Sequence, residues 1–280
     1  MKGQELKHRI NSIKETVKIT KAMQLVSASK MYKAEQVHEM SREFMEGISA
    51  AVTKLVSAGS YDHSYLTGRE NNRSGIIILS SDKGLCGDFN HVLMKNVEDN
   101  IRNKNIGKIY TVGHMAREYF QKKGIEVDHS YGYMSQEPHT FDAEAIAEDM
   151  MKLYDSGTLD EIYIIYTSNP ELSKQEVICK KLIPIEINRD NKEHREIMIE
   201  PGNKESLTAL LSLYLMSEIY HALCDNSLAI NYKRMVAMQQ STTNGEEIIE
   251  ELVMEFNHKR QESITTELMD ASSSEQGRKL

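Results

Sequence analysis

The chain has 280 residues, of which 27% are charged, and a formal net charge of −8 at pH 7. Its three cysteines show no CxxC spacing, which argues against a disulfide framework and against a cysteine-ligated zinc site. The first ten residues lack the apolar core of a signal peptide, and the most apolar run, at 207–223, is interrupted by Ser, Glu and His, which argues against a membrane span.

The first fifty-odd residues are predicted to form one long helix. No proline occurs before Pro138, and no glycine lies between Gly3 and Gly47, so this stretch contains no helix breaker. A helix over residues 2–56 would be about 80 Å long, because each residue adds about 1.5 Å. That length exceeds the core of a compact domain, so we expect a partner helix.

A repeat of 3.5 residues along this helix predicts a coiled-coil seam with a change of register near Ala34. The seam positions are Leu6, Ile10, Ile13, Val17, Thr20, Gln24, Ser27, Met31 and Ala34, followed by Val37, Ser41, Phe44, Ile48, Ala51 and Leu55. Because residues 20–27 of the seam are small or polar, we expect them to contact something besides the partner helix. A plain amphipathic helix with an imperfect heptad is the alternative interpretation.

Basic residues are concentrated in the same helix. Residues 1–42 hold nine Lys or Arg and four acidic residues, although the whole chain is acidic. Such a face can be merely solvated, or it can bind an acidic protein surface or a nucleic acid. Lysines dominate, and Tyr32 is the single aromatic residue before Phe44, which is not typical of a nucleic-acid surface.

Strand-like and helix-like segments alternate between residues 75 and 190. Short apolar runs predict strands at 75–80, 108–112, 125–128 and 161–166, and the segments between them predict helices at 89–102, 114–122 and 141–153. The extended segment 175–187 contains Pro184, as expected of an edge strand. The alternation predicts an inserted α/β domain with a Rossmann-like, mainly parallel sheet.

A glycine-bearing turn at residues 81–88 joins the first strand of this domain to its first helix. Many α/β proteins bind phosphate at such a turn. However, the spacing of Gly84 and Gly87 matches neither GxGxxG nor GxxxxGK[ST], and the sequence places no base beside Cys86. We therefore expect Gly84 and Gly87 to form a tight structural turn, and we expect no cofactor.

The partner of the first helix is predicted at the other end of the chain. From Lys204 to residue 272 there is no proline and one glycine, Gly245. Apolar residues recur along this stretch at Leu207, Leu210, Leu211, Tyr214, Leu215, Ile219, Met235, Met238, Ile249, Leu252, Phe256, Ile264 and Leu268. We therefore expect an N-terminal coiled-coil helix at 1–57, an α/β domain at 75–190, and a C-terminal helix at 204–272 that pairs antiparallel with the first.

Neither a metal site nor a catalytic site is predicted. None of the ten histidines lies four residues from another or within an HExxH motif. The paired acidic residues at 246–247 and 250–251 lie at helical spacing, where we expect solvated charge with no role in acid/base chemistry.

Four stretches resemble the gamma subunit of F-type ATP synthase in order and spacing. They are residues 10–31 (INSIKETVKITKAMQLVSASKM), 80–87 (SSDKGLCG), 233–238 (KRMVAM) and 257–268 (NHKRQESITTEL). The resemblance implies a coiled-coil shaft seated in a ring of three alpha and three beta subunits, with the α/β domain near the epsilon subunit and the membrane c-ring. It also implies a non-catalytic chain at the cytoplasmic face of a bacterial-type plasma membrane, whose rotation couples proton flow to ATP synthesis or hydrolysis.

The resemblance also implies roles for single residues. At the matched positions it implies contacts with the ring for Lys21, Met23, Arg260 and Gln261. It further implies that Arg234 holds the two helices together, and that the Lys-rich helix faces acidic loops of the beta subunits.

The chain departs from the family pattern at two places. Asp88 and Phe89 follow the Cys-Gly pair where a small residue is usual, and Ala229 and Ile230 replace a Ser-Glu pair. Two other functions stay open at this point. One is a stand-alone α/β nucleotide-binding protein with a coiled-coil appendage, and the other is a cytoskeletal or nucleic-acid scaffold built on the basic helix.

Overall fold

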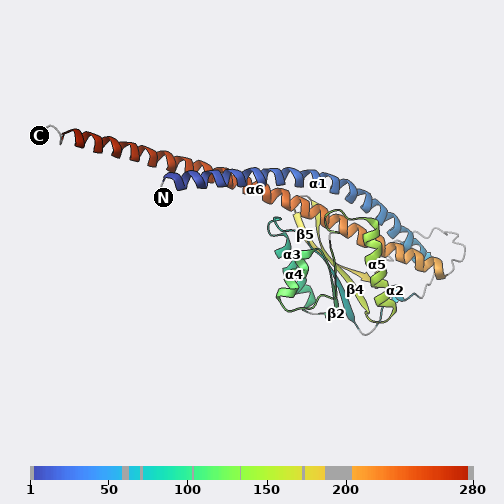
Figure 1. Cartoon of the computed structure of the whole chain (residues 1–280). Coiled ribbons are helices and arrows are strands. Elements are labelled where there is room, and N and C mark those ends of the chain that lie inside the picture. The colour runs from blue at the N-terminus through green and yellow to red at the C-terminus, as the bar shows by residue number, and fades with distance from the viewer. Residues whose placement is uncertain are drawn as a thin grey trace. The chain divides into compact units, whose positions relative to one another are not determined.

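A computed structural model describes residues 3–58, 63–69, 72–102, 104–132, 134–171, 174–186 and 204–276 (Figure 1). The elements are α1 (Gly3–Ala58), α2 (Ser64–Thr67), β1 (Arg73–Leu79), α3 (Phe89–Ile101), β2 (Asn105–Val112), α4 (His114–Lys122), β3 (His129–Tyr131), α5 (Thr140–Asp155), β4 (Glu161–Glu171), β5 (Lys174–Ile183) and α6 (Lys204–Gln276). The two long terminal helices predicted from the sequence are therefore confirmed.

The chain divides into two compact units. One consists of the described residues up to Ser27 together with those from Met235 onward, and we call it the two-helix unit. The other consists of the described residues between 28 and 234, and we call it the globular unit. Each unit contains a part of α1 and a part of α6, and each is described by itself below.

The globular unit is built on a five-stranded sheet of order β3-β2-β1-β4-β5. The first four strands are parallel, and β5 pairs antiparallel with β4 at the edge. The predicted mainly parallel sheet is thus confirmed, and Pro184 lies just beyond the end of β5, where it removes no hydrogen bond from the ladder.

The strand predicted at 125–128 is wrong, because β3 begins at His129. The backbone N–H of Ile125 donates to the carbonyl of Phe120 at the end of α4, at 3.0 Å. The Asp128 carboxylate accepts a hydrogen bond from the N–H of Ile109 at 2.9 Å. The apolar run therefore forms the connection that returns the chain from α4 to the sheet.

Both faces of the sheet are covered, as the continuous apolar strands require. On one face Ile77 and Leu79 of β1 pack with α5 and with parts of α1 and α6. On the other face Ile76 and Ile78 pack with α3 and α4 (Figure 1). By length and composition alone, α6 is long and apolar enough to cross a membrane, since its most apolar 18 residues have a mean hydropathy of 1.3. Half of this stretch is buried, and packing in this core accounts for apolar residues of the helix.

The register predicted for the end of α1 is correct in part. Ser41 is buried, and Ile48 and Leu55 are partly buried, as expected of seam positions. Phe44 is 41% exposed and Ala51 is exposed, so these two positions were wrongly placed in the seam. Val52 and Val56, four residues apart, are buried in the core cluster that also contains residues of α6, as expected of a helix packed into a globular core.

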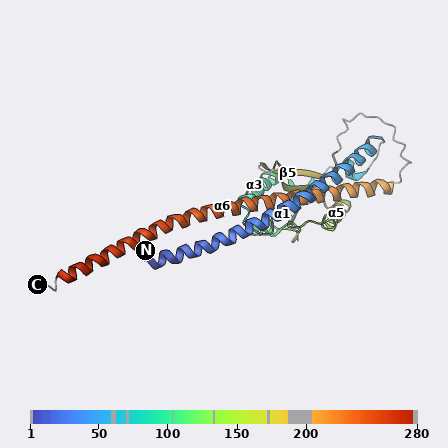
Figure 2. The ribbon, with the colours of Figure 1, turned by 90° about the horizontal axis from the view of Figure 1, so that it is seen from above.

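The two-helix unit pairs the start of α1 with the later part of α6 (Figure 2). Leu6 and Ile10 form a small buried cluster with Leu252. The hydroxyl oxygens of Thr20 and Thr242 are 2.7 Å apart. Residue numbers thus rise on one helix as they fall on the other, which confirms the predicted antiparallel pairing.

Candidate subunit interface

The two-helix unit exposes large apolar side chains along both helices. On α1, Leu25 is 67% exposed, and Ile19 and Val26 are similarly open. On α6, Met254 is 65% exposed, and Leu268 is equally open. Ile19, Leu25 and Val26 lie within about two turns of α1, and exposed apolar side chains that gather in this way are typical of a surface that another protein covers. Leu268 was among the apolar residues expected to pair with the first helix, and it is exposed instead. Leu25, Val26 and Met254 were not singled out from the sequence, because a 3.5-residue repeat identifies the buried seam and not its outer face.

Lysines on the same part of α1 form a stripe. Lys7, Lys14 and Lys21 recur every seven residues, which places them on one face of the helix, and all three are exposed. Among the described side chains none of the three forms an ion pair, whereas neighbouring Lys18 pairs with Glu15 at 2.8 Å. The stripe therefore offers positive charge that the described part of the unit does not neutralise.

The predicted contact residues all lie in the two-helix unit but in two separate places. Lys21 is exposed and Met23 is half-buried on α1, while Arg260 and Gln261 are exposed on α6. Because Thr20 opposes Thr242, residues 260–261 lie about 30 Å farther along α6 at 1.5 Å per residue. The structure thus gives two patches along the unit, and their contact with a ring stays a prediction.

Side chains hold the turn at 81–88 in the globular unit together. Cys86 is buried, and the Asn90 amide donates to the Ser81 hydroxyl at 2.8 Å and to the Cys86 sulfur at 3.3 Å. The Ser81 hydroxyl donates to the carbonyl of Lys83 at 2.8 Å. These hydrogen bonds tie Ser81, Cys86 and Asn90 together on the buried side of the turn, while Lys83, Gly84 and Leu85 are exposed.

The two glycines of this turn have different roles. Gly87 has φ +61°, a left-handed conformation that favours glycine. A Cβ added to Gly84 would meet no heavy atom within 4 Å, so nothing in the packing requires glycine there. The exposed Leu85 adopts φ 61° between them, which few non-glycine residues do.

Arg234 reaches this turn from α6. Its Nη2 donates to the carbonyl of Lys83 at 3.3 Å, and the neighbouring Lys233 pairs with Asp88 at 3.2 Å. Among the described contacts, the hydrogen bond of Arg234 goes to the turn and not to α1. Its predicted role in pairing the two helices therefore stays a prediction.

The two departures from the family pattern belong to one packing cluster. Phe89, Ala229 and Ile230 are all buried, and they share a core cluster with Cys86. The large Phe89 side chain after the turn therefore packs in the same core as the small apolar Ala229 of α6. Two changes that look independent in the sequence are neighbours in the fold.

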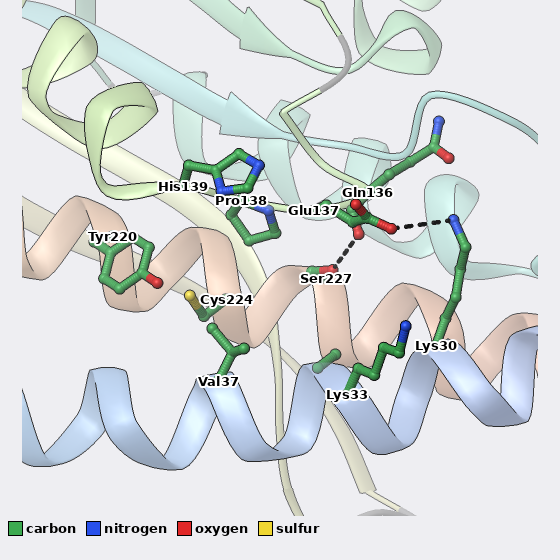
Figure 3. Close-up of a pocket in the computed structure, with 11 residues that line it drawn as sticks. Lys30, Lys33, Val37, Gln136, Glu137, Pro138, His139, Tyr220, Cys224 and Ser227 are labelled. Carbon is green, nitrogen blue, oxygen red and sulfur yellow. Dashed lines mark hydrogen bonds and ion pairs between the residues drawn. The ribbon is translucent and has the colours of Figure 1, made fainter.

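A cavity of about 300 Å³ lies between α1, α6 and the loop before α5 (Figure 3). Lys30 and Glu137 line one side of the cavity and form an ion pair, with Nζ and Oε1 3.9 Å apart. Val37 of α1 and Cys224 of α6 also line it. Burial raises the pKa of the Cys224 thiol to about 11, so the sulfur is protonated at neutral pH and is a poor nucleophile.

Comparison with known proteins identifies the family. A family model described as ATP synthase matches residues 2–276. An ATP synthase gamma chain of Glaesserella parasuis is 35% identical over 275 residues, covering 95% of this chain and 96% of the relative. An ATP synthase gamma chain of Heliobacterium modesticaldum is 31% identical over 276 residues, covering 95% of each chain.

Solved structures share the fold. A chain from the OSCP, F1 and c-ring assembly of Euglena gracilis mitochondrial ATP synthase superposes with a TM-score of 0.71 at 15% identity, covering 97% of this chain and 93% of that one. A chain from the central stalk and c-ring of Tetrahymena thermophila mitochondrial ATP synthase gives a TM-score of 0.63 at 23% identity, covering 79% of this chain and 98% of that one. With the relatives matched over nearly their whole length, this chain belongs to the ATP synthase gamma chain family.

Proposed function

We propose that this chain is the central-stalk rotor subunit of a proton-translocating F-type ATP synthase. The single observation that carries the proposal is the match to ATP synthase gamma chains over 95% of the sequence. The proposed partners are three alpha and three beta subunits, the epsilon subunit and the c-ring, at the cytoplasmic face of the membrane. In this role the chain binds no cofactor and contributes no catalytic residue.

The surface of the two-helix unit supports this role. Its exposed apolar residues and its lysine stripe need a protein surface to cover them, and they occupy the unit that is proposed to enter the ring. The unit is also asymmetric in charge, because α1 carries the lysines while α6 exposes Glu246, Glu247, Glu250 and Glu251. A turning shaft of this kind presents a different face to each surrounding subunit in turn.

Such rotation would change the catalytic sites through differential contacts. A ligand or partner shifts a conformational equilibrium only if it interacts differently with the two states. As the shaft turns, each catalytic site would therefore meet lysines, apolar side chains and glutamates in succession. The chain does no chemistry itself and acts by biasing three equilibria out of phase.

Co-purification tests the proposal. A tagged copy of the full chain expressed in its own cell should bring down alpha and beta ATPase subunits in equal numbers. A second tagged copy carrying Leu25→Glu and Met254→Glu should bring down less of both, because it puts charge on the two exposed apolar sites. Recovery of the tagged chain without any alpha or beta subunit would refute the rotor assignment.

A single substitution tests the predicted contact at Met23. Met23→Lys should leave the chain folded, since this side chain is only half-buried, but lower ATP synthesis relative to ATP hydrolysis in membranes. The matched control is Met40→Lys on the same helix in the globular unit, where the side chain is 71% exposed and no ring contact is proposed. Unchanged synthesis in the Met23→Lys membranes would contradict the contact.

The alternative of a stand-alone nucleotide-binding protein has weaker support. It depended on the turn at 81–88, whose glycine spacing matches no phosphate-binding motif and whose Ser81 and Cys86 side chains form hydrogen bonds within the protein. Calorimetry with the isolated chain and magnesium-ATP should therefore show no heat of binding. A saturable heat that disappears in Gly87→Val would instead favour the nucleotide-binding function.

A further inference from the structure

Two histidines and an aspartate meet inside the globular unit. His38 lies on α1, and His221 and Asp225 lie one turn apart on α6. His38 Nε2 and Asp225 Oδ1 are 3.6 Å apart, and one ligand atom from each of the three residues lies within 4.8 Å of the others. The two imidazole rings have centroids 5.1 Å apart.

Hydrogen bonds set the tautomer of His221. The Ser41 hydroxyl donates to the carbonyl of His38 at 2.7 Å, so its oxygen is left as an acceptor. It lies 3.1 Å from Nδ1 of His221, which therefore carries the proton. Nε2 of His221 is then the nitrogen with a free lone pair. Metal-binding histidines are commonly oriented this way, with the second ring nitrogen donating to a fixed oxygen.

The surroundings of the cluster are polar and largely closed to solvent. The side chain of Asp225 is 5% exposed and that of His38 is 20% exposed. The backbone N–H of Asn169 donates to Asp225 Oδ1 at 3.4 Å. The side-chain amide of Asn169 is buried, and neither its nitrogen nor its oxygen has a hydrogen-bond partner among the described atoms. A buried amide without a partner beside a carboxylate is a second sign of an internal polar site.

Two cations also approach His221, and both are already paired. Lys180 Nζ is 2.5 Å from a carboxylate oxygen of Glu218. Arg42 pairs with Glu39 at 2.5 Å and with Glu46 at 3.6 Å. Their charges are thus largely offset, and the carboxylate of Asp225 is left to balance an added positive charge.

We propose that His38, His221 and Asp225 bind a zinc-class divalent cation that links α1 to α6, with water as the fourth ligand. Two imidazole nitrogens and one carboxylate are a usual donor set for zinc. Ligand atoms about 2.0–2.1 Å from a tetrahedral ion are roughly 3.4 Å from one another. The His38–Asp225 distance of 3.6 Å is close to this value, and the ligand atoms of all three residues lie within 4.8 Å of one another.

The sequence did not reveal the site for a specific reason. The sequence holds no pair of histidines four residues apart, but His221 and Asp225 are a histidine and an aspartate with that spacing. The third ligand, His38, is distant in sequence and adjoins them only through the pairing of α1 and α6. The expectation of no metal site considered neither the mixed pair nor this pairing.

Zinc binding by the purified full-length chain tests the proposal. Zn²⁺ alone, titrated against a chromophoric chelator, should bind with a stoichiometry of one per chain, and Co²⁺ should give the visible absorption of a tetrahedral site. His38→Gln and Asp225→Asn should each abolish both signals. Circular dichroism checks that the variants are folded, and His38 is the safer position because its side chain is partly exposed. Retention of the bound zinc in both folded variants overturns the proposal.

A matched control lies elsewhere on α6. His258 and Glu262 have the same four-residue spacing, with Nδ1 and Oε1 3.4 Å apart, but both side chains are exposed. His258→Gln should therefore leave zinc binding unchanged. Loss of the bound zinc in this variant would overturn the proposal, because it would locate the ion at the exposed pair.

Two further variants examine the surroundings of the site. Ser41→Ala should weaken zinc binding by about 10- to 100-fold, because it frees the ring of His221 to rotate. Cys224→Ser should leave the affinity unchanged, and abolition of binding in that variant would reassign the ion to the thiol. None of these zinc-binding measurements requires an ATPase partner, so their results are independent of whether the rotor assignment is correct.

Discussion

The two parts of α6 show how one helix can serve two environments. In the globular unit every residue from Ala222 to Asn231 is buried, on all sides of the helix. In the two-helix unit, between residues 239 and 269, Thr242 and Leu252 are the buried positions among the described side chains. The first part is a core helix, and the second is a surface helix held by a narrow seam.

This difference separates stability from function along one element. Burial of apolar area is the main stabilising term, so the globular unit contributes most of the stability. The two-helix unit keeps large apolar side chains such as Leu25 and Met254 in solvent, and they gain favourable contacts only when another protein covers them. We therefore expect substitutions in the globular unit to change stability, and substitutions in the two-helix unit to change assembly.

The largest expected effect is a cavity in the globular core. Phe89 is fully buried, and Phe89→Ala should lower the free energy of unfolding by about 3–5 kcal/mol. Phe256, the aromatic residue of the two-helix seam, is only partly buried, and Phe256→Ala should cost about 1–2 kcal/mol because less area is lost. Urea denaturation followed by circular dichroism measures both values. Equal losses would show that the two units are equally packed.

A smaller effect is expected at Gly245, where α6 packs tightly against Val17 of α1. A Cβ on Gly245 would lie 2.5 Å from Cγ2 of Val17, a β-branched side chain with little freedom to move. Gly245→Ala should therefore destabilise the two-helix unit by about 1–2 kcal/mol, even though alanine favours the helix. Loss of helical signal on heating measures this effect.

Two variants isolate that clash. Val17→Ala combined with Gly245→Ala should recover most of the loss, because the added methyl then has space. Gly47→Ala on α1 in the globular unit, where a Cβ meets nothing within 4 Å, should instead stabilise the helix by about 0.5–1 kcal/mol. A loss of stability in Gly47→Ala would mean that the higher helix propensity of alanine does not determine the change in unfolding free energy at this exposed glycine.

Much of the fold follows from the sequence because its signals are local. The absence of helix breakers predicted α1 and α6, and apolar runs predicted the existence of β1, β2 and β4, although β2 begins three residues earlier and β4 ends five residues later than predicted. The errors occur where tertiary contacts decide. Residues 125–128 connect α4 to β3, and of these Asp128 hydrogen-bonds to Ile109 of β2. At the end of α1, Phe44 and Ala51 are exposed although the coiled-coil repeat placed them in the seam.

The candidate interface was harder to predict from the sequence than the fold, again because tertiary contacts decide which side chains are exposed. Lys21 and Met23 were chosen by their match to a family motif, and nothing in their spacing indicates exposure. The exposed faces of Leu25 and Met254 become visible once the seam fixes how each helix is turned. The cluster of His38, His221 and Asp225 depends on the pairing of two segments more than 180 residues apart, which no local pattern encodes.

Ion pairs give a final, smaller contrast between the units. In the globular unit Asp160 is buried and accepts from Nε of Arg73 at 2.9 Å and from its backbone N–H at 3.0 Å. The hydrogen bonds from Arg73 hold the pKa of Asp160 below its usual value, against the opposing effect of burial. In the two-helix unit the Glu15–Lys18 pair is exposed on both sides. Exposed pairs of this kind contribute little to stability.

The pH dependence of unfolding distinguishes these pairs. Because the folded pKa of Asp160 is lowered, its contribution is complete above the unfolded pKa of about 3.9 and is lost as the pH falls through the folded pKa. In Asp160→Asn, the urea midpoint of unfolding should therefore decrease less between about pH 4.5 and pH 2.5 than in the unmodified chain. In Glu15→Gln, the midpoint should change with pH as it does in the unmodified chain. An Asp160→Asn curve parallel to that of the unmodified chain would mean that the Arg73 pair does not differ between folded and unfolded states.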